Sequence, residues 1–351
     1  MRILSSNIFT AFAGLLLLAA LSCSKHNSAP DYNSNKTALN AAIDSLTKVY
    51  NNSVEGTKPG TYAIGAREAL DSSIQPAKQV TAGKFTQQEV NNALNSLLHA
   101  GDQFSNQLLQ QVSAANLVGY WTFSGNALDS SGNGHNGALK TGWTGSSAAT
   151  VVDGGTLPVL VADRFGRANN AYYFNNAATI QVPYSADLNP QSFTILLWVK
   201  RDGTNANNYM LSFNRWDGYK FQLQGGNLPF LTVQTTTGYH DVDDGGTAVD
   251  GPNKWVHVAV SFTPGTEKFY INGKLIRTAV VTGTPIPVPS NIDLTIGNEL
   301  PKSVYNLNDT NSPAYFWGAD FFIGALDDIR FYNTALSDAQ VLSIYTDEST
   351  L

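Results

Sequence analysis

Carboxylates are the side chains with which this sequence could hydrolyse a substrate, and few of them are placed for it. Retaining glycosidases hold two carboxyl groups about 5 Å apart, which on a β-strand requires alternate positions. From residue 116 onward the glutamates are Glu267, Glu299 and Glu348, and no Glu-x-Asp-x-Glu run occurs. We predict a surface charge for Glu267 and a tail position for Glu348. Glu299 is then the one glutamate placed to meet a ligand, and catalysis is disfavoured.

Aromatic side chains in loop-like segments are a second group with chemical potential, because Trp and Tyr rings stack on the C–H faces of sugars. They gather in "FNRWDGYKF" and in "ELPKSVYNLNDTNSPAYFWGAD", which spans Glu299 to Asp320 and is long for a connection. From these two segments we predict one glycan platform, made of Arg215, Trp216, Tyr219, Glu299, Tyr305, Tyr315 and Trp317. The alternative is that the aromatic rings only pack the two loops onto the fold.

The remaining polar motifs favour neither catalysis nor nucleic-acid binding. Asp241 and Asp243 in "HDVDDGG" have strand spacing, but their Gly-rich neighbours favour a turn or an ion site over an acid-base pair. His257 in "WVHVAV" is predicted to be a strand residue with an ordinary partner. The net charge is −6 and Lys and Arg form no cluster, so a nucleic-acid partner is excluded.

The N-terminus predicts export and a lipid anchor. Met1 and Arg2 precede the apolar run Ile8 to Leu21, which has the length of a signal-peptide core and is short for a membrane span. Cys23 is the only cysteine, so no intramolecular disulfide can form. "LAALSC" resembles the lipobox of bacterial lipoproteins, although Ala20, Leu21 and Ser22 depart from its preferred pattern. We predict a lipoprotein signal peptide over 1–22, lipidation at Cys23 and a polar tether over 23–35; the alternative is an ordinary secreted protein.

A helical region is predicted over 36–115. Leu39, Ile43, Leu46 and Tyr50 share one helix face. A second face runs Ala66, Leu70, Ile74 and Ala77, where Pro76 must kink or shorten the helix. The third helix starts with a capping box, Thr86 with Glu89. Three such helices can bury a small core, and "GTYAIGAREALDSSIQ" with "QQEVNNALNSLLHAGDQF" resembles the FIVAR-type helical modules of bacterial surface proteins.

From residue 116 to 351 the hydrophobic period changes from helical to alternating. Runs such as "FTILLWVKRD" and "WVHVAVSFT" are rich in β-branched and aromatic residues and end at Gly, Asn, Asp or Pro. Asn272-Gly273 is the preferred two-residue hairpin turn. About a dozen strands and one terminal helix, capped by Ser337 or Asp338, predict a mainly β fold built as an antiparallel two-sheet sandwich.

Six blocks of this region carry a family resemblance. They are "LVGYWTFSGNALDSSGNGHNG", "RANNAYYFNN", "SFTILLWVK", "WVHVAVSFTPGTEKFYINGKLIRT", "LTIGN" and "GALDDIRFYNTALSDAQV". In this order they resemble the signature blocks of the concanavalin A-like, laminin-G-like jelly-roll domains. The resemblance implies the fold; it does not imply one function, because this fold carries lectins, glycosidases and adhesion proteins.

The same resemblance implies a structural calcium ion. In the family, the Asp-rich turn after the first strand commonly binds calcium together with an acidic residue of the last strand. Carried over, the ligands would be Asp129, Asn133, His135 and Asp327. The alternative is a plain turn in which Asp129 accepts hydrogen bonds from backbone amides.

Together these patterns predict a surface lipoprotein that resembles those of Bacteroidetes-like bacteria. It would be anchored in the outer membrane, exposed on the cell surface, and would bind a polysaccharide or other glycan without hydrolysing it. The alternative is an adhesion or scaffold protein with surface protein partners, and a glycoside hydrolase is the third interpretation.

Overall fold

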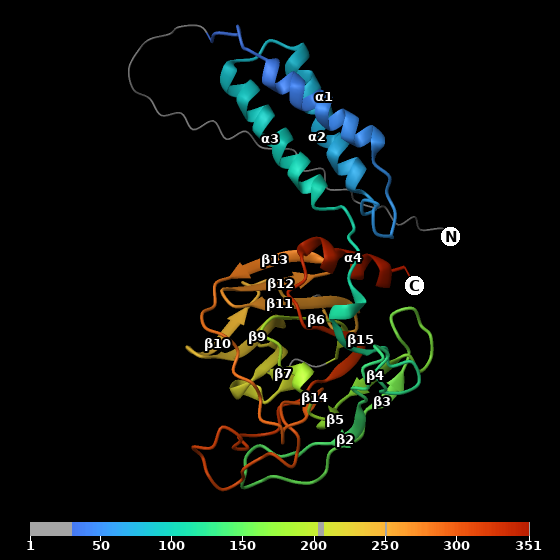
Figure 1. The fold of residues 1–351 in the computed structure, drawn as a ribbon, viewed down its shortest axis with the longest axis vertical. Coiled ribbons are helices and arrows are strands. Elements are labelled where there is room, and N and C mark those ends of the chain that lie inside the picture. The colour runs from blue at the N-terminus through green and yellow to red at the C-terminus, as the bar shows by residue number, and fades with distance from the viewer. Residues whose placement is uncertain (1–29, 203–206, 250, 351) are drawn as a thin grey trace, which may run out of the picture.

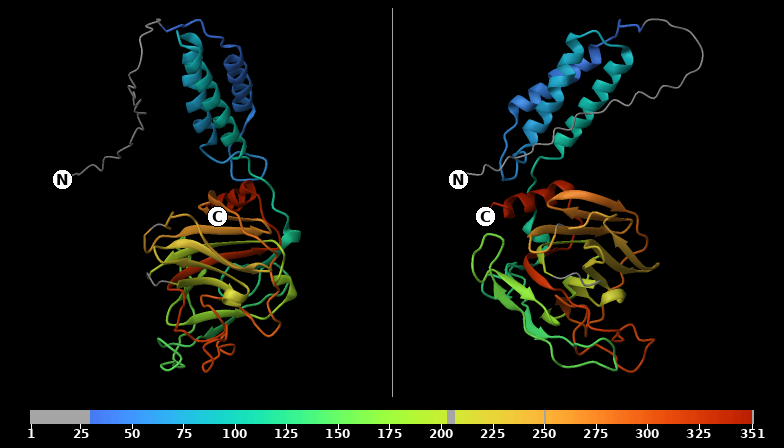
Figure 2. Two further views of the ribbon diagram at one scale, coloured as in Figure 1. Left: turned by 90° about the vertical axis from the view of Figure 1, so that its left-hand side faces the viewer. Right: turned by 180° about the vertical axis from the view of Figure 1, so that it is seen from behind.

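The structure is a computed structural model that describes residues 30–202, 207–249 and 251–350. Its elements form two parts, a bundle of three helices followed by a β-sandwich (Figure 1). Two further views show the bundle at one end of the molecule and long loops of the sandwich at the opposite end (Figure 2). No helix in these ranges combines the length and hydropathy that crossing a bilayer requires.

The bundle consists of α1 (Thr37–Asn52), α2 (Ala66–Ala82) and α3 (Gln87–Ser105). The apolar faces expected from the sequence meet in one cluster, in which Leu39, Leu70 and Leu97 are fully buried. The capping box of Thr86 and Glu89 is present at the start of α3. Pro76 does not end α2, which continues to Ala82. Burial of Ile74 and Ala77 on either side of Pro76 offsets the backbone hydrogen bond that it removes.

The sandwich has two sheets in which the paired strands run antiparallel, as the sequence predicts. The eight-stranded sheet has the order β13 (Lys274–Ala279), β12 (Thr266–Ile271), β11 (Val256–Thr263), β6 (Phe193–Arg201), β15 (Gly324–Tyr332), β4 (Ala171–Phe174) and β3 (Val159–Val161), with β1 (Leu117–Trp121) also paired to β15. The seven-stranded sheet has the order β10 (Gly238–Asp243), β9 (Leu228–Thr235), β8 (Tyr219–Gln224), β7 (Asn207–Phe213), β14 (Leu294–Ile296), β5 (Ala178–Val182) and β2 (Ala138–Thr141).

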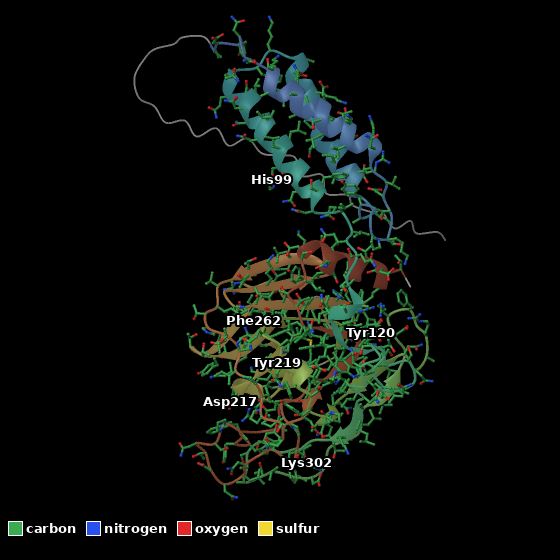
Figure 3. The ribbon with its side chains drawn as sticks, in the orientation of Figure 1. His99, Tyr120, Asp217, Tyr219, Phe262 and Lys302 are labelled. Atoms are coloured by element: carbon green, nitrogen blue, oxygen red, sulfur yellow. The ribbon has the colours of Figure 1, made fainter. Side chains whose placement is uncertain are left out.

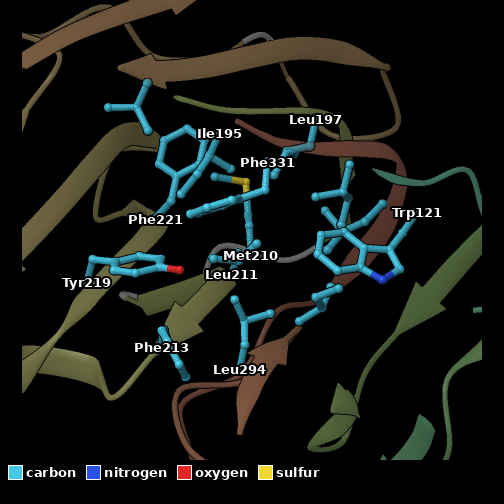
Figure 4. Packing of buried hydrophobic residues seen from close by; sticks show 14 of the residues in the cluster. Trp121, Ile195, Leu197, Met210, Leu211, Phe213, Tyr219, Phe221, Leu294 and Phe331 are labelled. Carbon is cyan, nitrogen blue, oxygen red and sulfur yellow. The ribbon is translucent and has the colours of Figure 1, made fainter. Parts of the chain in front are cut away.

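The core lies between the sheets and is rich in aromatic rings (Figure 4). Alternation along each strand decides which side chains enter it. In β8, Tyr219, Phe221 and Leu223 belong to the core cluster, so Lys220 and Gln222 lie on the outer face of the seven-stranded sheet. The hairpin between β12 and β13 turns at Asn272 and Gly273, both at positive φ, as expected.

A terminal helix, α4 (Asp338–Glu348), covers part of the outer face of the eight-stranded sheet. Ser337 caps it, with Gln340 completing a capping box. Its residues Val341 and Ile344 form a second apolar cluster with Leu196 and Ala259, which point away from the main core. The C-terminal segment is thus part of the folded domain.

Glu348 corrects the expectation of a tail position, because its residue is only 1% exposed. Trp198 Nε1 donates to its Oε2 at 2.8 Å and Arg330 Nε to its Oε1 at 2.6 Å. Arg164 donates to its backbone oxygen from Nε and Nη2, at 3.1 and 2.8 Å. Docking of α4 carries the carboxylate into this cluster, an effect that local sequence does not reveal.

The other two surprises in this sheet are also buried polar groups. Glu267 is fully buried, not a surface charge, and neither carboxylate oxygen has a hydrogen-bond partner among the described residues. On β12 it pairs with the core residue Phe262 of the neighbouring strand β11, and the strand alternation that buries Phe269 buries Glu267 too. The ring nitrogens of His257, expected to have an ordinary partner, are likewise buried without a hydrogen bond in the described part of the chain, with Nε2 3.9 Å from Glu348 Oε2.

The ionisable groups under α4 have shifted pKa values. Burial raises the pKa of Glu348 to about 7. Burial and the neighbouring carboxylate of Asp328 raise the pKa of Asp327 to about 8, although Arg164 opposes this. Burial, with the charges of Arg164 and Arg330, lowers the pKa of His257 to about 3. The folded protein therefore keeps His257 neutral and retains protons on carboxyl groups at neutral pH.

We predict that the protein loses stability as the pH rises from 6.5 to 8. In that window the unfolded chain has already released the protons of Glu348 and Asp327, whereas the folded chain releases them only near pH 7 and 8. An acid with a raised pKa in the folded state stabilises the fold while it keeps its proton, and this stability is lost as the pH rises through that pKa. Here we expect the free energy of unfolding to fall by about 2 kcal/mol. Urea denaturation at both pH values measures this.

The Glu348→Gln variant should show a smaller fall than the unmodified protein. Asp347→Asn is the matched control, because Asp347 is the neighbouring acid on α4 and lies in a partly exposed pair with Lys58. An equal fall in Glu348→Gln, or a constant free energy in the unmodified protein, would contradict the assignment.

Candidate functional site

The long loop Glu299 to Phe322, between β14 and β15, packs against the loop 142–157 that follows β2. Ala319 N donates to Gly145 O at 2.8 Å, and Trp143 Nε1 donates to Lys302 O at 3.1 Å. Lys302 Nζ lies 2.6 Å from Asp153 Oδ1. Both loops lie at the end of the molecule away from α3, as the labels of Lys302 and His99 show (Figure 3). These contacts hold the two loops against each other.

Arg215 fixes the long loop to the seven-stranded sheet. It lies in a single 3-10 turn, Arg215–Asp217, between β7 and β8, and is 1% exposed. Its Nη1 donates to Glu299 Oε1 at 2.9 Å. Its Nη2 donates to the backbone oxygens of Pro313 and Tyr315. One guanidinium thereby joins the start and the far part of the loop.

Glu299 and Tyr305 belong to the same buried network. Tyr305 Oη donates to Glu299 Oε1 at 2.6 Å. Burial raises the pKa of Glu299, while the charge of Arg215 and the hydrogen bond from Tyr305 oppose the rise. Because Glu299 is 2% exposed and bonded inside the protein, its role here is structural.

Four residues of the predicted platform are therefore corrected. Arg215, Glu299 and Tyr305 hold the loop, and Tyr219 lies in the main core, where its hydroxyl donates to Leu188 O at 2.9 Å (Figure 4). Tyr219 was expected in a loop, but it begins β8 on the core side. For these four the packing alternative describes the structure.

The other three platform residues are at least partly accessible. Trp317 is 56% exposed. Tyr315 meets it edge-on, with ring centroids 4.7 Å apart. Trp216 is half-buried and lies over the Arg215 guanidinium, whose central carbon is 4.0 Å from the ring centroid. The exposed aromatic surface of the long loop is thus centred on Trp317.

A hollow of about 570 Å³ adjoins Trp317 between the two loops. Its lining is Thr144, Gly145, Ser146, Asn176, Trp317, Gly318, Ala319, Asp320 and Phe321. Asp320 Oδ2 accepts a hydrogen bond from Asn207 Nδ2 at 3.0 Å. Burial raises the pKa of Asp320, opposed by that hydrogen bond and by Arg215 and Lys220. The lining thus combines residues with hydroxyl, amide and carboxylate groups and an indole ring, and Asn176 Nδ2 donates to Gly154 O at 3.2 Å.

Asn176 and Asp320 were missed as site residues. Asp320 closes the aromatic segment that carried the platform prediction, so its position three residues after Trp317 was the available signal. Asn176 follows β4 by two residues and has a positive φ of 44°, as an Asn in a tight turn often does. Nothing in the local pattern places that turn beside a loop more than a hundred residues away.

Lys220 is a further polar residue that sequence reasoning missed. On the outer face of the sheet it is 4% exposed, and its Nζ donates to Gln222 Oε1 at 2.8 Å. Burial lowers its pKa to about 8, and the charges of Asp241 and Glu299 oppose this. Its available signal was the alternation of "YKFQLQ", which sends Lys and Gln to one face.

In the Asp-rich loop after β1, Asp129 accepts hydrogen bonds from backbone amides, which is the arrangement expected of a plain turn. Asp129 Oδ1 accepts from the backbone N–H groups of Tyr120 and Ser131, at 2.9 and 2.8 Å. Its Oδ2 accepts from Ser131 Oγ at 2.7 Å and from His135 N at 3.0 Å. Burial would raise the pKa of Asp129, but these hydrogen bonds outweigh it and hold that pKa below its usual value.

Of the other three expected calcium ligands, Asp327 is held by an ion pair, and His135 accepts from Trp121 Nε1 with its backbone oxygen at 2.8 Å, while its Nε2 has no hydrogen-bond partner among the described residues. Asn133 Nδ2 donates to Leu117 O and Val118 O, at 2.8 and 2.9 Å. Asp327 Oδ2 pairs with Arg164 Nη1 at 2.8 Å. His135 is buried, with Nε2 4.0 Å from Asp187 Oδ2. Within the described ranges no three His, Cys, Asp or Glu side chains are grouped to hold a metal ion. The residues do not fit the expected calcium set, and calcium binding stays a prediction from resemblance.

Asp241 and Asp243 lie on β10, not in a turn, and each has a partner. Asp241 Oδ1 accepts from the Thr232 hydroxyl, and Asp243 Oδ1 lies 2.6 Å from Arg277 Nη1. They are therefore held by neighbouring strands, as surface pairs commonly are.

We predict that Arg215→Ala destabilises the domain and loosens the long loop. Removing the guanidinium leaves Glu299 buried without its ion pair and leaves two backbone oxygens of the loop without their donor. We expect the free energy of unfolding to fall by about 3 to 5 kcal/mol. Arg277→Ala is the matched control, because its pair with Asp243 is partly exposed and contributes about 1 kcal/mol or less. Urea denaturation and amide hydrogen exchange over 300–322 measure the two effects. Equal unfolding midpoints for the two variants would contradict this role.

Comparison with known proteins agrees with this fold. Residues 174–342 match the family model Laminin_G_3, described as the concanavalin A-like lectin/glucanases superfamily. No curated protein matches the chain. Among solved structures, domain 4 of AbnA, an extracellular GH43 arabinanase from Geobacillus stearothermophilus in complex with arabinotriose, is 19% identical, with a TM-score of 0.45 over 66% of this chain and 98% of that one.

Toxin domains are also similar. The botulinum neurotoxin serotype G binding domain is 17% identical, with a TM-score of 0.46 over 67% of this chain and 52% of that one. The binding domain of Paraclostridial Mosquitocidal Protein 1 is 19% identical, with a TM-score of 0.45 over 66% of this chain and 52% of that one. This chain thus spans about half the length of those toxin chains. Residues 174–342 of the β-sandwich, with its two antiparallel sheets, are thus similar to the concanavalin A-like lectin/glucanases superfamily.

Proposed function

We propose that the sandwich binds carbohydrate, without hydrolysing it, in the hollow beside Trp317. The observation that carries this proposal is the indole of Trp317, which is 56% exposed at a hollow that also offers the polar side chains of Asn176 and Asp320. Large aromatic rings are usually buried in a folded domain, so an exposed one beside convergent polar groups favours ligand binding.

The chemistry of the hollow suits a sugar. The apolar face of a pyranose or furanose ring stacks on an indole, while amide and carboxylate groups pair with its hydroxyls. The two loops are held together by the hydrogen bonds of Ala319 and Trp143, so the ligand groups are positioned before a sugar arrives. The family description, which names lectins and glucanases, supports a carbohydrate ligand.

The positions of the glutamates support binding without hydrolysis. Glu267, Glu299 and Glu348 have exposures of 0, 2 and 1%, and they are buried in separate places: on β12, at the start of the long loop and in the last turn of α4. A retaining glycosidase needs two carboxyl groups about 5 Å apart that reach the substrate. None of these three lines the hollow, where Asp320 is the acid.

We further propose that the protein is a surface lipoprotein in which the helical bundle separates the sandwich from the membrane. The expected signal peptide and Cys23 lie outside the described residues, so the proposal depends on the sequence there. The bundle and the long loops that border the hollow lie at opposite ends of the molecule (Figure 2), an arrangement that supports a spacer role for α1, α2 and α3.

We predict that Trp317→Ala weakens glycan binding by about 2 kcal/mol, near thirtyfold, because it removes the stacking surface. A glycan array identifies the ligand, and affinity electrophoresis in gels containing that polysaccharide gives the dissociation constant. Tyr239→Ala is the matched control, since Tyr239 is an equally exposed aromatic residue, at 62%, on the edge strand β10.

Equal loss in both variants, or binding unaffected by Trp317→Ala, would reject the hollow as the site. Failure of the unmodified protein to bind any glycan would reject carbohydrate binding and favour the protein-binding alternative.

We predict that Cys23→Ser releases the full-length chain from membranes, because a lipid-bearing cysteine is the proposed anchor. Detergent-phase partitioning of cells that express either form measures this. Membrane association of the Cys23→Ser chain would contradict lipidation at this residue.

A further inference from the structure

The lining of the hollow beside Trp317 contains one acidic residue and no basic residue. Of the residues that line it, Asp320 is the one with an ionisable side chain. The segments that form it, 142–157 and 299–322, contain Asp153, Glu299, Asp309 and Asp320 but a single cation, Lys302. A ligand that enters the hollow therefore meets a carboxylate and no lysine or arginine of the lining.

Two of the nearby cations are already paired with carboxylates, and a third, Lys220, whose charge acts on Asp320, lies on the outer face of the sheet and donates to Gln222 Oε1. Lys302 Nζ lies 2.6 Å from Asp153 Oδ1, and Arg215 Nη1 donates to Glu299 Oε1 at 2.9 Å. Neither is in the lining of the hollow. Since each has its own carboxylate, an anionic sugar would have to displace that partner to gain an ion pair.

The carboxylate of Asp320 is held in place to accept hydrogen bonds. Asn207 Nδ2 binds its Oδ2 at 3.0 Å, which leaves Oδ1 to accept from the ligand. A carboxylate accepts well from sugar hydroxyls and repels another carboxylate or a sulfate at the same distance. Stacking on Trp317 is the same for a neutral and an anionic ring, so Asp320 is the group that can distinguish them.

We propose that the hollow selects uncharged glycans and that Asp320 is the residue that determines this specificity. This inference rests on the proposed carbohydrate binding and adds the chemical class of the ligand. Uronic acids, sialic acids and sulfated sugars are the excluded class. The exclusion is electrostatic, so it weakens as salt shortens the distance over which charges act, to about 3 Å at 1 M.

The test uses two forms of one polysaccharide. The probe is the neutral polymer that the unmodified protein binds best in the array, compared with its carboxymethylated derivative by affinity electrophoresis at about 0.02 and 1 M NaCl. We expect the derivative to bind at least about tenfold more weakly at low salt, and the ratio to shrink at high salt.

Variants assign the effect to one residue. Asp320→Asn should bring the two dissociation constants together at low salt, because it keeps the shape and removes the charge. Asp309→Asn is the matched control: Asp309 is an exposed acid of the same loop, its removal changes the net charge equally, and it does not line the hollow. Should Asp320→Asn fail to fold, the salt dependence of the unmodified protein decides.

The outcomes separate the two proposals. Equal binding of both polymers, tighter binding of the charged one, a ratio independent of salt, or an unchanged ratio in folded Asp320→Asn would overturn the selection of neutral glycans while leaving carbohydrate binding intact. Binding to no glycan, neutral or anionic, would overturn the proposed function itself and this inference with it.

Discussion

The buried ion pair between Arg215 and Glu299 is the interaction on which the candidate site depends. A loop of this length has many conformations, and fixing one of them costs conformational entropy at every residue. Arg215 offsets part of that cost at a single point, because its guanidinium binds Glu299 and the backbone oxygens of Pro313 and Tyr315 together. Desolvation of both charges is tolerable only because each has a partner. Trp317, two residues beyond Tyr315, is thereby held at the surface.

A second buried carboxylate has the corresponding role on the other sheet. Glu348 joins the last turn of α4 to Trp198 and Arg330. The same helix receives contacts from the segment that leads out of the bundle, where Gln110 N donates to Ser343 Oγ at 2.7 Å. In both places an irregular or terminal segment is attached to a sheet by a carboxylate with several donors. The apolar core gives the sandwich its stability. The two carboxylate networks fix the positions of the long loop and of α4 on its sheets.

Sequence reasoning predicted the elements well because periodicity and turn chemistry act locally. The helices, the capping box of Thr86 and Glu89, the cap at Ser337 and the Asn272-Gly273 hairpin all depend on residues a few positions apart. The environment of single polar residues was predicted wrongly where their partners are distant in the sequence. Glu348 reaches Trp198 only because α4 packs on β6, and Arg215 binds a loop about a hundred residues later in the chain. The exposure of Trp317 was expected because aromatic residues in a polar loop are a compositional signal, whereas no such signal marked Asn176.

The bundle and the long loops that border the hollow lie at opposite ends of the molecule (Figure 1), which has a consequence for how such a molecule would hold a large ligand. α3 alone has 19 residues and spans about 28 Å. One exposed indole with a few hydrogen bonds gives a short-lived contact. Under the proposed function, copies anchored on one surface would let a polysaccharide chain engage several hollows at once, and the second contact would be made at a high effective concentration. Retention would then depend on avidity, that is, on the spacing of copies and of repeats along the glycan.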